Sequence, residues 1–158
     1  MDSDHHATRV GRPGRAFAVL TALGAAVLVA SLWLPRIKPE SFEDFYGTYG
    51  GRLGIPEEIP EDAELADLPG WFFPVPAAGQ VILAWLATYV ALRPECVNLG
   101  AAVATAIALV LWVLGAVVLF PGLDAPPFER LAGTWVAAAG AAVTAAGLLA
   151  LGNRRQHS

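Results

Sequence analysis

The sequence has a single cysteine, Cys96, and a single lysine, Lys38, among its 158 residues. One thiol cannot form an internal disulfide or a Cys-x-x-Cys redox pair, which excludes four-helix thiol oxidoreductases. The formal net charge is −4 and no stretch forms a basic patch, so no nucleic-acid partner is expected. Charged residues make up only 15% of the chain, against about 25% in soluble domains. This scarcity of charge argues against a soluble protein.

Catalytic chemistry is also missing from the apolar parts of the chain. Four long stretches contain no Asp, Glu, Lys, Arg or His, the residue types that mark proton relays and ion paths in membranes. The residue patterns of intramembrane proteases are absent from them, and all three histidines lie near the ends of the chain. We therefore predict a protein that is not an enzyme and that uses no cofactor and no metal.

The sequence does contain long apolar runs. A bilayer core about 30 Å thick requires about 20 apolar residues in a helix. The four charge-free stretches have nineteen, seventeen, twenty-three and twenty-one residues. They predict an all-α, integral membrane four-helix bundle with spans at residues 16–34, 76–92, 98–120 and 131–151. The first stretch could be a signal peptide, but its nineteen residues exceed the usual apolar core of about 7–15, which favours a retained span.

Arginines in the short connections predict the orientation, because cytoplasmic segments carry the excess of basic residues. Six arginines would share one side of the membrane, at positions 9, 12, 15, 93, 154 and 155. We therefore place three segments in the cytoplasm of a plasma-membrane protein: the tails 1–15 and 152–158, and the turn 93–97 that contains Cys96. Residues 35–75 and 121–130 become extracytoplasmic loops.

The loop 35–75 is long and acidic, with nine of the fourteen carboxylates of the chain. Short amphipathic helices are expected in it, one of them opened by Pro60 and running through Leu68. Another would carry an aromatic row that could contact a partner, formed by Phe42, Phe45, Tyr46 and Tyr49. The acidic residues lack the spacing of an EF-hand, which leaves weak divalent-cation binding, a partner surface or a solvated loop as alternatives.

Small residues at helical spacing predict where the spans pack, because membrane helices associate through close backbone approach. The most regular row is in the fourth span, where glycine recurs every seven residues. Its members are Gly133, Ala137, Gly140, Thr144 and Gly147. Weaker rows are Ala18, Ala22 and Ala25 in the first span and Ala101, Ala104, Ala108 and Gly115 in the third. In the second span Gln80 must find a partner for its amide: another helix, water at the outer membrane interface, or a pore or ligand.

Two features of the sequence resemble those of small four-span membrane proteins of high-GC Gram-positive bacteria. One is the segment Ser31–Pro35, and the other is Gly133-Thr134-Trp135 at the start of a predicted helix that ends with Arg154-Arg155. Many members of that class have no assigned function, so the resemblance implies a layout and no activity. The acidic loop is longer than the class suggests. The sequence favours an accessory or scaffold protein that contacts the lipid bilayer and a membrane-protein partner or further copies of itself. The alternatives are an oligomeric passive channel and, less favoured, a membrane enzyme that uses loop carboxylates.

Overall fold

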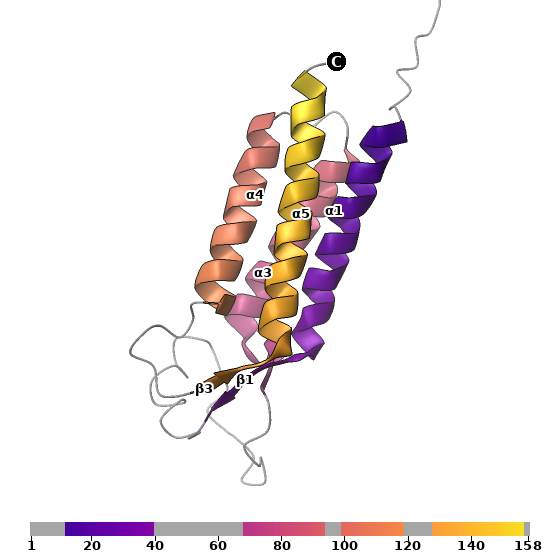
Figure 1. Ribbon diagram of the computed structural model, residues 1–158. Coiled ribbons are helices and arrows are strands. Elements are labelled where there is room, and N and C mark those ends of the chain that lie inside the picture. Colours follow the sequence, from indigo (N-terminus) through magenta and orange to yellow (C-terminus); the bar gives the residue numbers. More distant parts are fainter. Residues whose placement is uncertain (1–11, 40–67, 94–98, 119–127, 157–158) are drawn as a thin grey trace, which may run out of the picture.

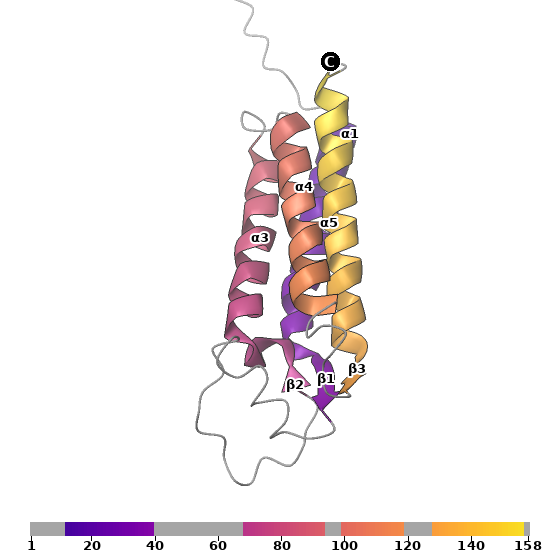
Figure 2. The ribbon, with the colours of Figure 1, turned by 90° about the vertical axis from the view of Figure 1, so that its left-hand side faces the viewer.

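The computed structural model describes residues 12–39, 68–93, 99–118 and 128–156, and it is mostly helical. Four helices pack side by side along most of their length (Figures 1 and 2). A π-helical turn at Leu114–Val118 extends the third of them. The four are α1 (Arg12–Ala30), α3 (Pro74–Leu92), α4 (Leu99–Val113) and α5 (Ala132–Gln156). Each contains a segment long and apolar enough to cross a membrane.

The helix ends differ by a few residues from the predicted spans. Helix α3 starts at Pro74, since proline suits the first helical turn, where its missing N–H leaves no bond unmade. Helix α5 continues past the predicted end at Leu151 to Gln156. Gly152 does not end it, because this residue is buried against α4, where a Cβ would lie 3.0 Å from that of Ala102.

A small antiparallel sheet at one end of the bundle adds to the predicted helical fold (Figure 1). Leu68, predicted to end a short helix, lies in a strand, and the predicted loop 121–130 ends in another. The strand order is β2-β1-β3, and Ile37 of the central strand pairs with both Leu68 and Arg130. The strands are β1 (Pro35–Pro39), β2 (Leu68–Pro69) and β3 (Phe128–Arg130).

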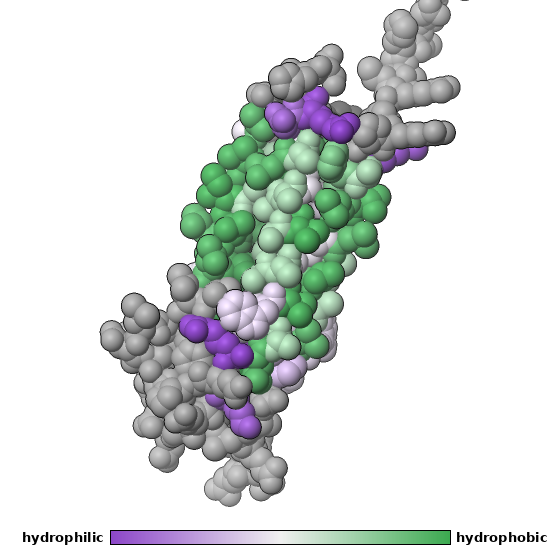
Figure 3. Space-filling model, viewed as in Figure 1, coloured by the Kyte–Doolittle hydropathy of each residue, from purple (hydrophilic) through white to green (hydrophobic). Residues whose placement is uncertain are grey.

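The bundle is apolar on its outer surface as well as in its interior. Many large aliphatic and aromatic side chains are exposed along the helices, including Leu23, Ile82 and Leu111. Figure 3 shows a hydrophobic band over the helices of the visible face, between hydrophilic ends. A soluble bundle would instead place polar side chains on its outer faces. Tryptophans 33, 71 and 135 are exposed near the sheet, where amphipathic aromatic rings sit at membrane interfaces.

Candidate functional site

The polar centre of the structure is the amide of Gln80 on α3, which is fully buried. Its Nε2 donates hydrogen bonds to the carbonyl oxygen of Leu28 and, at 3.1 Å, to Oγ of Ser31. The Ser31 hydroxyl in turn donates to the Leu28 carbonyl at 2.7 Å. These bonds join α3 to the end of α1, so the structure shows the interhelical hydrogen bond that was one of the partners predicted for Gln80.

Arg36 in β1 completes this cluster from the sheet at the end of the bundle. Its guanidinium Nη2 donates to Oε1 of Gln80 at 2.6 Å and to Oγ of Ser31 at 3.4 Å. The residue is only 3% exposed, and its buried Nε has no hydrogen-bond partner among the described residues. Gly70 lies against the guanidinium, and a Cβ there would come within 2.6 Å of Cζ. Any larger residue at position 70 would displace the arginine.

Among the described residues, the groups that bond to the charged side chain of Arg36 are neutral. Burial lowers the pKa of its guanidinium to about 10, which keeps the side chain protonated at neutral pH. Its side-chain acceptors are an amide and a hydroxyl, and Glu129 is the sole acidic residue within the described ranges. Taking a charge out of water costs several kcal/mol unless hydrogen bonds replace its hydration. The bonds to Gln80 and Ser31 therefore determine whether this end of the bundle is stable.

The backbone of Arg36 ties the same point to the fourth helix. Its carbonyl oxygen accepts hydrogen bonds from the backbone N–H of Leu131 at 2.7 Å and from Oγ1 of the buried Thr134 at 3.0 Å. Its side chain reaches α1 and α3, so one residue connects three helices. We call Ser31, Arg36 and Gln80 the arginine cluster.

The predicted glycine row of α5 lies against α1 and the segment that follows it. A Cβ on Gly140 would lie 2.8 Å from the backbone N of Leu28, and one on Gly133 would lie 2.6 Å from the carbonyl oxygen of Pro35. At Gly147 an added Cβ would collide with Oγ1 of Thr21. Ala137 and Thr144 are fully buried between these positions. The row therefore sits at a backbone-to-backbone contact.

The remaining predicted positions are not covered by the structure. Phe42, Phe45, Tyr46, Tyr49 and Cys96 lie outside the described residues. Within the part of the chain that is described, no group of three or more His, Cys, Asp or Glu residues could hold a metal ion. The hydrogen bonds of the arginine cluster are suited to holding helices together.

Sequence reasoning singled out Gln80 but missed Arg36, Ser31 and Gly70. A signal was present, since Arg36 directly follows the proline that ends the first apolar run and Gln80 begins the second span from the same side. A lone amide and a lone cation at the same depth could have been paired. No protein-family model, curated protein or solved structure matches this chain.

Proposed function

We propose that this chain is an integral membrane protein that crosses the bilayer four times and acts as an accessory or scaffold component of a membrane complex. The observation that carries the proposal is the apolar outer surface of four span-length helices around a tightly packed interior. In water such a surface would promote aggregation, whereas lipid solvates it at no cost.

The orientation follows from the distribution of arginines. The start of α1 and the end of α5 lie at the same end of the bundle (Figure 1). Exposed Arg15, Arg93 and Arg154 belong to the helix ends on that side, as cytoplasmic arginines should. The sheet and the arginine cluster are then extracytoplasmic, together with the acidic segment between β1 and β2.

The scaffold role is favoured over the channel by the state of the buried polar groups. The hydroxyls of Thr21 and Thr144 donate to carbonyl oxygens of their own helices, and Gln80 is bonded to Leu28, Ser31 and Arg36. Apolar side chains such as Leu28, Leu109 and Val113 fill the centre between the helices. Within the described residues a single copy therefore offers no polar path across the membrane, and a channel would have to form between copies.

Co-purification from native membranes in a mild detergent tests the role. A stoichiometric partner protein that stays bound through size-exclusion chromatography supports the scaffold. A homo-oligomer without any partner contradicts it and favours the channel.

Topology is the first specific prediction. A reporter that is active only in the cytoplasm should be active when fused to either end of the chain, because four spans return it to the side where it began. A matched fusion in the segment between Pro39 and Leu68 should be inactive. Activity at one end alone would contradict four spans.

Labelling of Cys96 is the second prediction, and it uses the sole thiol of the chain. Cys96 falls in the sequence between the end of α3 and the start of α4, and both of these lie at the end of the bundle proposed to be cytoplasmic. A membrane-impermeant maleimide should therefore leave intact cells unlabelled and should label the protein after permeabilisation. A Cys96→Ser variant controls for background. Labelling of intact cells would invert the orientation.

A further inference from the structure

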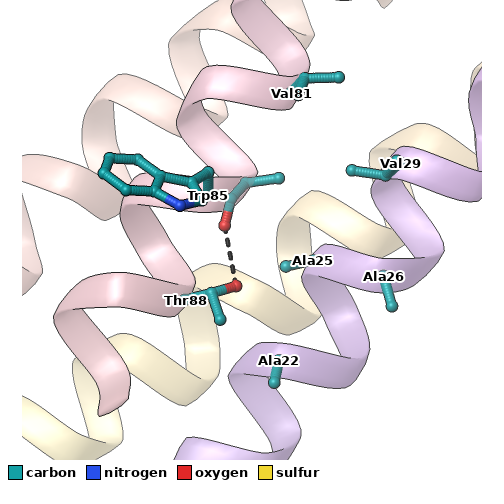
Figure 4. A pocket seen from close by; sticks show the side chains of 8 residues that line it. Ala22, Ala25, Ala26, Val29, Val81, Trp85 and Thr88 are labelled. Atoms are coloured by element: carbon teal, nitrogen blue, oxygen red, sulfur yellow. Dashed lines mark hydrogen bonds between the residues drawn. The ribbon is translucent and has the colours of Figure 1, made fainter. Parts of the chain in front are cut away.

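Helices α1 and α3 are joined at the end of the bundle that carries the sheet, and a groove runs between them from there toward the other end. The hydrogen bond from Gln80 to the Leu28 carbonyl closes the groove at the sheet end. The next residues, Val81 and Val29, already line an apolar groove of about 370 Å³. Figure 4 shows Val81 pointing from α3 toward α1, and Val29 and Ala25 pointing from α1 toward α3. The groove exists because α1 contributes mainly alanine to this seam, so no long side chain fills it.

An aromatic and cationic column leads from this groove to the cytoplasmic end of α3. Trp85, which is 65% exposed, is one of the residues that line the groove, and Figure 4 shows its ring pointing away from α1. The ring stacks on that of Tyr89 with centroids 5.5 Å apart. The guanidinium of Arg93 lies 5.4 Å from the centroid of the Tyr89 ring. Arg93 is exposed at the end of α3, so its charge faces the lipid headgroups of the cytoplasmic leaflet.

We propose that the groove holds one acyl chain of an anionic phospholipid of the cytoplasmic leaflet, with the phosphate at Arg93. This inference rests on the membrane topology proposed above. The depth fits, because a rise of about 1.5 Å per residue puts Thr88 and Val81 about 8 and 18 Å below Arg93. The hydrocarbon of one leaflet is about 15 Å deep. The groove therefore lies beside the half of the acyl chain that is nearest the centre of the bilayer when the phosphate is held at Arg93.

The size of the groove favours a lipid chain over a protein helix. A helix with side chains is about 10 Å wide and has a pitch of about 5.4 Å, so one turn occupies about 400 Å³. The groove of about 370 Å³ accommodates less than one turn, whereas a flexible hydrocarbon chain can follow it along its length. Since lipid is as apolar as the lining, the chain alone would give little selectivity, and the charge of Arg93 supplies it.

Quenching by brominated acyl chains tests the proposal with the intact protein. The protein is reconstituted in phosphatidylcholine with a minor fraction of phosphatidylglycerol, and bromine is placed on one lipid at a time. The Trp85 signal is the difference between the wild type and Trp85→Phe. Attraction by one arginine predicts about a fivefold stronger quenching per brominated phosphatidylglycerol than per brominated phosphatidylcholine.

Two pairs of variants assign the effect. Arg93→Gln should remove the preference, whereas Arg154→Gln, at the same end but stacked on Phe17 of α1, should keep it. Ala26→Leu fills the groove and should also remove it, while Ala108→Leu on the exposed face of α4 should not.

Three results would overturn the proposal. The first is equal quenching by the two lipids in the wild type, and the second is an unchanged preference in Arg93→Gln. The third is quenching that falls as the protein-to-lipid ratio rises, which would mean that a second copy covers the groove. Failure of membrane insertion is distinct, because the four tryptophans that remain in Trp85→Phe would then escape quenching by any brominated lipid. An inverted topology is detected separately by the reporter fusions.

Discussion

Replacing Gly140 by leucine is expected to lower the melting temperature of the protein in mild detergent by roughly 10 °C. A Cβ at this position would lie 2.8 Å from the backbone N and 3.0 Å from Cα of Leu28. Backbone atoms cannot rotate away, so α1 and α5 would have to separate. Overpacking of this kind costs about 3 kcal/mol, and at this chain length about 1 kcal/mol corresponds to about 2–4 °C.

The neighbouring residue provides the control. Ala139 is exposed, so Ala139→Leu adds the same side chain to the lipid-facing side of α5. Leucine there favours insertion by a few tenths of a kcal/mol and should leave the melting temperature unchanged. If both variants melt at the same temperature, α1 and α5 do not meet at the glycine row and the packing described here is wrong.

Replacing Gln80 by leucine is expected to destabilise the protein by about 3–5 kcal/mol, because it leaves the buried guanidinium of Arg36 without its closest partner. The double variant Gln80→Leu with Arg36→Met should recover most of that loss, since removing both members of a buried polar pair is often neutral. Thermal unfolding in detergent measures both variants.

Thr88→Val is a suitable control for the loss of a polar group on the same helix. The Thr88 hydroxyl donates only to the Ala84 carbonyl of its own helix and is partly exposed, so its removal should cost little. If the double variant were no more stable than Gln80→Leu alone, the buried charge would not be the cause of the destabilisation.

The four apolar helices could be predicted from the sequence because the number of consecutive apolar residues directly gives the length of each helix. The packing faces could be predicted only where the pattern was specific. The glycine row of α5 lies at a tight contact with α1, but the residues of α1 that meet it are Thr21, Gly24 and Leu28. Of the predicted row, Ala25 is buried in the core and Ala18 packs against buried core residues, whereas Ala22 lines the groove.

The third span shows why alanine is a poor guide. Ala104, Ala108 and Gly115 of its predicted row are exposed, and the buried face is formed by Ala102, Thr105, Ala106, Leu109 and Val113. In a helix with alanine at many positions, several faces are equally small, and only the neighbouring helices decide which one is buried. A glycine repeat is more selective because each glycine carries a backbone penalty that close packing must offset.

The sheet was not predictable, because none of its strands exceeds five residues and their partners are far apart in sequence. Prolines 35 and 39 bound the central strand, and such a segment reads locally as a loop. The arginine cluster was missed for the same reason. Its members come from the ends of separate elements and meet only when the sheet closes over the helices.

The pairing of β1 with β2 makes the packing of the bundle independent of the length of the segment 40–67. Ile37 pairs with Leu68, so the two ends of that segment are held side by side whatever lies between them. Doubling the length of a closed loop costs only about 0.6 kcal/mol of chain entropy. The segment can therefore lengthen, shorten or be replaced by another module without moving a helix. The two strands fix only where the segment leaves and re-enters the fold, so its sequence can change while the helical bundle is retained.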